Sequence, residues 1–370
     1  MYQAEIRVDL DAIRHNVALL RARTTAEVMT VVKADGYGHG MLPVARAALD
    51  AGATWLGVCT LDEALALRAA GITAPVLAWL LVPGLPLHRG VEAGVDLSAA
   101  STSLLGEIVG AARTAGRTAR VHLKIDTGLN RGGAKPADWA ALVEAAAKAQ
   151  ADGLVEVVGV WSHFAGADAP DRSTVDSQLA AFHEGLAVAG RFGLNPRVRH
   201  LANSAATLTR PDTHFDLVRP GIATYGLSPV SGEGFGLRPA MTVRARVLIA
   251  KRVPGGEGVS YGHTYTTRED TTLAVVPLGY ADGIPRHASN VGPVLLAGRR
   301  RTIAGRVCMD QIVLDCGDDP VSAGDVAVLF GPGDQGEPTA DDWADAVGTI
   351  NYEIVTRMST VRVPRVYDGE

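Results

Sequence analysis

The first two thirds of the chain alternate short apolar strand signals with helical patterns such as Leu61–Ala70 and Ala137–Ala149. A leading helix is expected directly after Asp9, whose side chain suits a helix N-terminus. The expected strands are Thr30–Lys33, Trp55–Cys59, Pro75–Trp79, Val95–Ser98, Arg120–Lys124, Val155–Ser162, Val198–Leu201 and Asp216–Arg219. Eight strand–helix units in roughly 220 residues predict a TIM-type (β/α)8 barrel, an α/β fold, with a doubly wound sheet as the main alternative.

After residue 235 the pattern changes to strand-like segments separated by Gly and Pro turns, with one helix expected at Ala340–Thr349. The expected strands are Met241–Val253, Thr272–Pro277, Val291–Leu296, Arg301–Val307, Gln311–Asp315 and Asp325–Leu329. We therefore predict two domains, a barrel over residues 1–235 and a mostly β domain over residues 236–370.

The bulk composition of the 370 residues excludes several classes of function. The net charge is −5 and no basic tract is present, which makes nucleic acid an unexpected partner. No window approaches the ~18 consecutive apolar residues of a membrane span, and the N-terminus has no signal core, so we expect a cytoplasmic protein away from the membrane. Three cysteines in apolar contexts suit reduced thiols, and no metal-binding spacing occurs.

Lys33 lies at the end of the first expected strand and precedes a glycine-rich turn, Ala34–Gly40. A lysine this close to an apolar strand is costly to desolvate, so its amine is expected to be paired or neutral. A neutral amine at a strand end is the group with which a carbonyl cofactor forms a Schiff base.

Polar residues also follow four other expected strands, and in a barrel the carboxyl ends of the strands gather the chemistry. Besides Lys33 and Tyr37 after the first strand, these residues are Lys124 and Asp126–Arg131 after the fifth, His163 after the sixth, Asn203 and Ser204 after the seventh, and Arg219–Gly221 after the eighth. Any one of them could be an ordinary local hydrogen-bonding residue, but five such strand ends together indicate one site.

In these segments and in the second half of the chain, the sequence resembles the alanine racemases, a family that depends on pyridoxal 5'-phosphate. The matching segments span both domains in order and are Lys33–Gly40, Lys124–Gly128 with Arg131, Ser162–Phe164, Ala202–Ser204, Arg219–Gly221, Ser260–Gly262, Gly305–Asp310 and Ile350–Glu353. The resemblance implies a racemase that interconverts L- and D-alanine and supplies D-alanine for peptidoglycan precursors. It also implies a homodimer with shared active sites in the bacterial cytosol.

The resemblance assigns Lys33 to the Schiff base and to proton transfer, and Tyr261 to the second base, contributed from the other subunit. Arg219 is expected to hydrogen-bond the pyridine nitrogen without protonating it, since a guanidinium is not a practical proton donor. The expected cofactor-binding residues are Lys33, Tyr37, His163, Asn203, Ser204, Arg219, Gly221, Ile222 and Tyr352.

The substrate carboxylate is expected at Arg131 and at the backbone N–H of Met309 from the partner chain, with Asp310 orienting its neighbours. In this family the lysine that matches Lys124 is often carbamylated, giving an anion that positions the arginine. A plain Lys124 paired with an acid is the alternative.

Three other functions remain open from the sequence: a broad-specificity amino-acid racemase, a barrel-fold decarboxylase that keeps Cys308 near its site, and a cofactor carrier without catalysis. The carrier is disfavoured because such single-barrel proteins lack a second domain. Two formal motifs are set aside. Gly331–Gly336 matches a dinucleotide loop but has no surrounding βαβ unit, and Gly258–Gly262 matches a nucleophile elbow but lacks the flanking strand and helix.

Overall fold

The computed structural model describes residues 2–358 and 361–369 and contains the predicted barrel. An eight-stranded parallel sheet has the order β8-β7-β6-β5-β4-β3-β2-β9. Its strands are β2 (Glu27–Val31), β3 (Trp55–Val58), β4 (Val76–Ala78), β5 (Asp96–Ala99), β6 (Ala119–Lys124), β7 (Val155–Trp161), β8 (Val198–His200) and β9 (Leu217–Val218). Backbone hydrogen bonds from Asp216 to Arg199 and from Arg219 to Ala202 bring β9 against β8, so the barrel is nearly closed. The (β/α)8 prediction is confirmed, and the doubly wound alternative is wrong.

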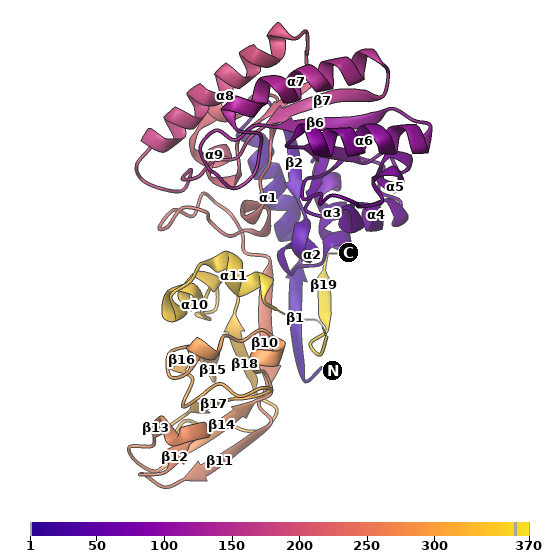
Figure 1. Ribbon diagram of the computed structural model, residues 1–370. Coiled ribbons are helices and arrows are strands. Elements are labelled where there is room, and N and C mark those ends of the chain that lie inside the picture. Colours follow the sequence, from indigo (N-terminus) through magenta and orange to yellow (C-terminus); the bar gives the residue numbers. More distant parts are fainter. Residues whose placement is uncertain (1, 359–360, 370) are drawn as a thin grey trace.

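Helices and short turns alternate with these strands, and the longer helices lie on the outer side of the barrel (Figure 1). They are α1 (Leu10–Ala22), α2 (Lys33–Tyr37), α3 (Met41–Asp50), α4 (Leu61–Ala69), α5 (Leu87–Glu92), α6 (Thr102–Ala115), α7 (Pro136–Ala151), α8 (Ser173–Arg191) and α9 (Ser204–Thr209), with short 3-10 turns η1 (Pro211–Thr213) and η2 (Ile222–Tyr225). The expected leading helix is α1, and the Asp9 side chain caps it by accepting from the backbone N–H groups of Asp11 and Ala12.

The barrel interior away from the strand ends is closely packed and combines an apolar cluster with the buried polar side chains of Asp96, His122 and His200. Met29, Trp55, Leu77, Val158, Val198 and Leu217 form a buried cluster there. A packed interior leaves open space only at the carboxyl ends of the strands, and a site is therefore confined to that end.

The second half of the chain forms a mostly β domain, as predicted. Its elements are β10 (Met241–Arg246), β11 (Ile249–Val253), β12 (Gly258–Val259), η3 (Tyr261–His263), β13 (Tyr265–Thr266), β14 (Thr271–Val276), η4 (Tyr280–Asp282), η5 (Arg286–Ala288), β15 (Pro293–Leu296), β16 (Arg299–Thr302), β17 (Ile312–Asp315), β18 (Val326–Phe330), α10 (Ala340–Val347), α11 (Asn351–Thr356) and β19 (Arg365–Asp368). The single strand expected at Met241–Val253 is two strands that lie in different sheets, because β10 pairs with β1 and β18 whereas β11 pairs with β14.

The N-terminal strand β1 (Ala4–Asp9) joins this second domain and not the barrel. It lies between β10 and β19 in a six-stranded sheet of order β16-β15-β18-β10-β1-β19. The first and last strands, β1 and β19, therefore lie side by side below the barrel (Figure 1). Because β1 pairs with β10 and β19, the first strand belongs to the sheet of the β domain although it precedes the barrel in the sequence. A domain boundary after residue 235 remains a proposal, and it applies to the chain that follows β1.

Candidate active site

A cavity of about 680 Å³ opens at the carboxyl ends of the barrel strands. It contains every residue expected to bind the cofactor, together with Lys124 and Arg131. The lining residues are Val31, Lys33, Ala34, Tyr37, Cys59, Trp79, Leu80, Lys124, Arg131, Gly132, Trp161, His163, Asn203, Ser204, Arg219, Gly221, Ile222, Tyr352 and Thr356. Most of them come from strand ends, while Tyr352 and Thr356 come from α11 near the end of the chain.

Lys33 follows β2, which begins at Glu27 and ends at Val31, two residues before the predicted strand end at Lys33. The backbone after it turns through four consecutive left-handed residues, from Ala34 to Tyr37, so the chain leaves the strand directly after the lysine. The Glu63 carboxylate supports this turn by accepting from the backbone N–H of Ala34 at 2.7 Å. Within the described residues the Lys33 amine has no hydrogen bond or ion pair, and its Nζ lies 5.9 Å from the centre of the Tyr37 ring. The amine is therefore free to react with a carbonyl group.

A cradle suited to a phosphate group lies beside Lys33. Asn203 caps α9 by accepting from the backbone N–H of Ala206 at 3.0 Å. The hydroxyl of Ser204, the next residue, accepts from the backbone N–H of Gly221 at 2.8 Å. A Cβ at Gly221 would lie 2.4 Å from the Tyr37 hydroxyl, so only glycine allows the backbone and the phenol to approach the same space. Backbone N–H groups and hydroxyls that converge in this way fit a phosphate.

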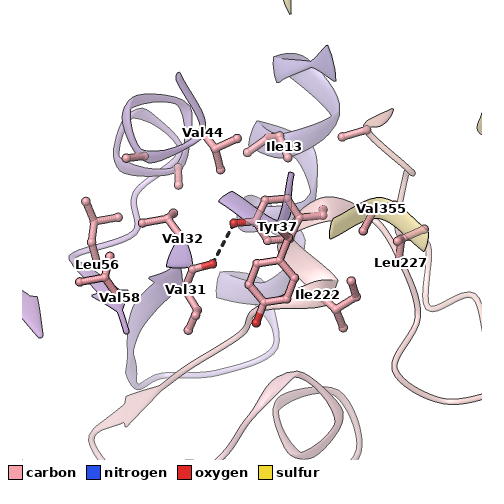
Figure 2. Close-up of a cluster of buried hydrophobic side chains, with 14 of the residues drawn as sticks. Ile13, Val31, Val32, Tyr37, Val44, Leu56, Val58, Ile222, Leu227 and Val355 are labelled. Atoms are coloured by element: carbon pink, nitrogen blue, oxygen red, sulfur yellow. Dashed lines mark hydrogen bonds between the residues drawn. The ribbon is translucent and has the colours of Figure 1, made fainter. Parts of the chain in front are cut away.

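Tyr37 is held rigidly at this cradle by apolar and aromatic neighbours. Its ring stacks on Tyr225 with centroids 4.7 Å apart, and Tyr352 lies 6.3 Å away. Figure 2 shows Tyr37 among buried side chains that include Ile222 and Val355. Burial raises the pKa of Tyr37 and of Tyr352 well above that of an ordinary phenol, so both hydroxyls remain hydrogen-bond donors.

Arg219 is the buried cation of the site, with 5% of its surface exposed. Its Nη2 donates to the backbone oxygens of Ser162 at 2.7 Å and Leu201 at 3.2 Å, and Nη1 donates to His200 Nδ1 at 3.2 Å. The Nη2 group also lies 3.3 Å from His163 Nδ1. A guanidinium has five N–H bonds, so among the described residues the Nε–H and one Nη1–H keep no acceptor and can reach a ligand. Burial lowers the pKa of Arg219 to about 9, which leaves it charged at neutral pH.

The remaining charges of the cavity are also mostly positive. Burial, together with the charges of Arg219 and Arg131, lowers the pKa of Lys124 to about 8. The Lys124 Nζ lies 4.3 Å from the centre of the Trp161 ring. Burial and the same arginines hold the pKa of His163 well below its usual range, so His163 is neutral. Lysines and arginines gathered in a partly enclosed cavity favour an anionic ligand.

Tyr261, Met309 and Asp310 lie outside this cavity, in the β domain. The Tyr261 side chain is 67% exposed and Met309 is 57% exposed. Their two loops touch, because the Ser260 hydroxyl donates to the Arg306 backbone oxygen at 2.6 Å. Asp310 is exposed beside Met309 and accepts from the Gln311 side chain at 3.4 Å. Within one chain the structure therefore brings the cofactor residues together but leaves these three on a separate exposed face.

Several lining residues were not predicted as site residues, above all Cys59, Trp79 and Trp161. Trp79 and Trp161 stand at or just after the ends of strands β4 and β7, so their positions could have indicated them. The Trp161 ring lies flat against His200, with centroids 5.6 Å apart and an interplanar angle of 2°. Burial raises the pKa of the Cys59 thiol, which makes it a poor nucleophile.

The described residues contain no group of three or more side chains arranged to hold a metal ion. Likewise, none of the helices in the described part of the chain is both long and apolar enough to span a bilayer. The three cysteines are free thiols.

A nearly closed (β/α)8 barrel with an unpaired lysine at the carboxyl ends of its strands, joined to a β domain, is the architecture of a two-domain barrel protein with a reactive amine in its cavity. Residues 8–229 match the family model described as alanine racemase, N-terminal domain, and residues 240–367 match the alanine racemase, C-terminal domain. The chain therefore belongs to the alanine racemase family.

Individual relatives agree with this assignment over the whole length. The chain is 74% identical to an alanine racemase of Salinispora arenicola, with complete coverage of both proteins. It is 53% identical to an alanine racemase of Mycobacterium tuberculosis, covering 98% of this chain and 96% of the relative. Among solved structures, alanine racemase from Streptomyces coelicolor A3(2) superposes with a TM-score of 0.98 at 58% identity, covering 100% of this chain and 98% of the other. A Bacillus anthracis alanine racemase with bound L-Ala-P has a TM-score of 0.90 at 37% identity, covering 100% and 96%.

Proposed function

We propose that this chain interconverts L- and D-alanine by removing the α-proton on one face of the substrate and returning a proton on the other. The observation that carries the proposal is the unpaired Lys33 amine beside a phosphate cradle and a buried arginine, in a chain that matches alanine racemases from end to end. The same reaction supplies D-alanine for cell-wall precursors.

We infer that pyridoxal 5'-phosphate is the cofactor, because the cavity fits both of its ends. Lys33 would hold its aldehyde carbon covalently, and Ser204, Gly221, Ile222, Tyr37 and Tyr352 would hold its phosphate. The free N–H groups of Arg219 would reach its ring nitrogen, with His163 and Asn203 alongside. When bound, this group supplies the electron sink that makes the α-proton of an amino acid removable.

The chain's own residues then divide the work of racemisation. The Lys33 Nζ would take or return a proton on one face of the substrate. Arg219 donates hydrogen bonds without giving up a proton, which limits the electron sink and so disfavours side reactions. Arg131 lies at the cavity and binds the substrate carboxylate, where the cationic surroundings favour an anion.

The second face needs a base that this chain does not place in its own cavity. Tyr261 is exposed in the β domain, in contact with the loop that carries Met309 and Asp310. We propose that a homodimer brings the partner subunit's Tyr261 and the partner's Met309 to the cavity, with Asp310 orienting its neighbours. The free cysteines are consistent with a cytosolic location.

Lys124 carries a further part of the proposal, carbamylation of its amine. A pKa of about 8 leaves a fraction of the amine neutral near pH 7, and only the neutral amine adds carbon dioxide. The product is an anion among Arg131 and Arg219, which exchanges a costly cation for a favourable pair. Protein crystallised with bicarbonate should show three extra atoms on the Lys124 Nζ, and bare ammonium density there would contradict carbamylation.

The activity is tested by incubating the purified, cofactor-supplied protein with pure L-alanine. We expect D-alanine to accumulate until the two isomers are equal and the optical rotation is lost. L-lysine and L-serine in parallel reactions test for a broad-specificity racemase, and released carbon dioxide tests for a decarboxylase. Unchanged L-alanine would exclude the proposed function and leave a cofactor carrier.

A further inference from the structure

A buried chain of hydrogen bonds leads from Arg219 across the barrel interior, away from the cavity. His200 Nδ1 lies 3.2 Å from Arg219 Nη1, and His200 Nε2 lies 2.8 Å from His122 Nδ1. His122 Nε2 lies 3.0 Å from a carboxylate oxygen of Asp96. Asp96, His122 and His200 have no exposed surface. The proposed reaction assigns no role to Asp96 or His122.

The direction of the hydrogen bonds in this chain follows from its two ends. Arg219 has only donors, so His200 Nδ1 must accept and the single proton of neutral His200 must lie on Nε2. His122 Nδ1 must then accept from His200, which places the proton of His122 on Nε2. That proton meets Asp96, which can accept when it is ionised. Each histidine is therefore neutral and carries its proton on Nε2.

The electrostatics of the buried groups agree with this direction. Burial and the charge of Arg219 hold the pKa of His200 well below its usual range, so it is neutral. Burial would raise the pKa of Asp96, but hydrogen bonds from His122 and Arg120 outweigh it and lower that pKa, so the carboxylate is ionised. Arg120 donates to both oxygens of Asp96, at 2.7 and 3.1 Å.

The two imidazoles have little freedom to turn. Trp161 lies flat against His200, and Trp55 meets His122 edge-on with centroids 5.5 Å apart. A Cβ at Gly159 of β7 would lie 2.4 Å from His122 Nδ1, so glycine at this position provides the space for the ring. Neighbouring barrel strands thus hold both rings where their nitrogens face each other.

We propose that Asp96 and His122 are positioning residues for Arg219: they fix His200 as a hydrogen-bond acceptor and so hold the guanidinium with its remaining N–H groups free for the ligand in the cavity. No carboxylate is paired directly with Arg219 in the described residues. Arg219 is instead connected to the carboxylate of Asp96 by the hydrogen bonds through His200 and His122. A chain that ends in a carboxylate strengthens each acceptor along it. The effect on catalysis rests on the proposed function, whereas the proton positions do not.

Asp96→Asn tests the hydrogen-bond chain from Arg219 to Asp96, because an amide can donate as well as accept. The direction of the hydrogen bonds is then no longer fixed, and a reversed chain would point a His200 Nδ1–H at the Arg219 donors. Glu156→Gln is the matched control. Glu156 accepts from the same Arg120 at 3.2 Å but is exposed and takes no part in the hydrogen bonds that link Asp96 to Arg219.

The proton positions are read from 15N spectra of the full chain labelled in histidine, both without and with added pyridoxal 5'-phosphate. In the parent protein at neutral pH we expect two histidines that are neutral and carry the proton on Nε2, as the hydrogen-bond partners of His200 and His122 require. Asp96→Asn should shift both toward a mixture of tautomers, and Glu156→Gln should leave them unchanged. A charged ring or an Nδ1 proton on either histidine in the parent protein would overturn the proposal, even if Asp96→Asn failed to fold.

The rate of racemisation then tests the role. We expect Asp96→Asn to lower kcat about ten-fold with little change in KM, since one hydrogen bond to a charged group is weakened. Glu156→Gln should keep the parent rate. Altered tautomers with an unchanged kcat would overturn the positioning role. An inactive parent protein would contradict the proposed function, and the 15N spectra alone would then test the hydrogen-bond chain from Arg219 to Asp96.

Discussion

The carboxyl end of the barrel and the exposed face of the β domain both carry residues expected in the site, but they differ in how complete they are. At the barrel end, residues from the ends of seven strands and from α11 converge on one cavity. On the β domain, Tyr261 and Met309 are largely exposed beside each other, and neither lines that cavity. Under the proposed function, the cavity holds the cofactor within one chain, and the second base comes from another copy of the chain. The predictions below test this division of labour.

The largest expected effect is at Lys33 in the barrel. Lys33→Ala removes both the covalent tether and one base, so racemisation should fall by about a thousand-fold or more. Borohydride treatment and mass spectrometry should find the cofactor on the parent chain and not on the variant. Lys148→Ala, which removes an exposed lysine of α7, should behave as the parent protein does. Substantial racemisation by Lys33→Ala would disprove the assignment.

Tyr261 tests the other side of the comparison. Tyr261→Phe should slow exchange of the α-deuterium of L-alanine by several hundred-fold, and that of D-alanine much less, because one face loses its base. The control is Tyr265→Phe in the adjoining hairpin, where the hydroxyl donates to Asp315 at 2.7 Å and so points into the domain. Equal slowing of both isomers would contradict the assignment of Tyr261 to one face.

Mixed dimers sharpen the same prediction. A dimer of one Lys33→Ala chain and one Tyr261→Phe chain holds one site with both bases and one with neither. An equal mixture should therefore recover about a quarter of the parent activity, since about half of the dimers are mixed. No recovery after the chains have exchanged would show that each site is built from a single chain.

The contact between α11 and the barrel can be tested by two glycines with the same backbone conformation. Gly38 has φ +82° and a Cβ there would lie 2.4 Å from the Val355 backbone oxygen, whereas Gly71 has φ +83° and open space around it. We expect Gly71→Ala to lower the free energy of unfolding by about 1 kcal/mol and Gly38→Ala by about 3 kcal/mol. Urea unfolding measures both. Equal losses would mean that α11 does not pack closely on the turn after Lys33.

The smallest expected effect is the pH dependence that Lys124 imparts to the cofactor-free barrel. Its pKa is about 8 in the folded protein and near ~10.5 in an unfolded chain. Between these values only the unfolded chain carries the proton, so the free energy of unfolding should rise with pH, by about 2 kcal/mol relative to Lys124→Met. The two proteins are compared by urea unfolding at pH 7.5 and 10 in buffer free of carbon dioxide. A difference in the free energy of unfolding that does not change with pH would show that Lys124 has an ordinary lysine pKa in the folded protein or is already carbamylated.

Much of the barrel could be predicted because its signals are local. Each of the eight expected strands overlaps an observed one, since a buried parallel strand is a short apolar run bounded by turns. The N-terminal strand β1 was missed even though Ile6 and Val8 are buried and alternate with less buried residues. Its partners are β10 and β19, and pairing over such a distance in the sequence leaves no local signal.

The sequence by itself determined the barrel, the order of its strand ends and the family, because these depend on patterns within short segments and on motifs that are matched in order. Tertiary structure alone decided that Asp96 and His122 stand behind Arg219, that Trp161 stacks on His200, and that Tyr261 lies outside its own chain's cavity. Those relations depend on side-chain directions in the closed barrel and on the placement of one domain against the other, and neither is encoded in the spacing of residues along the chain.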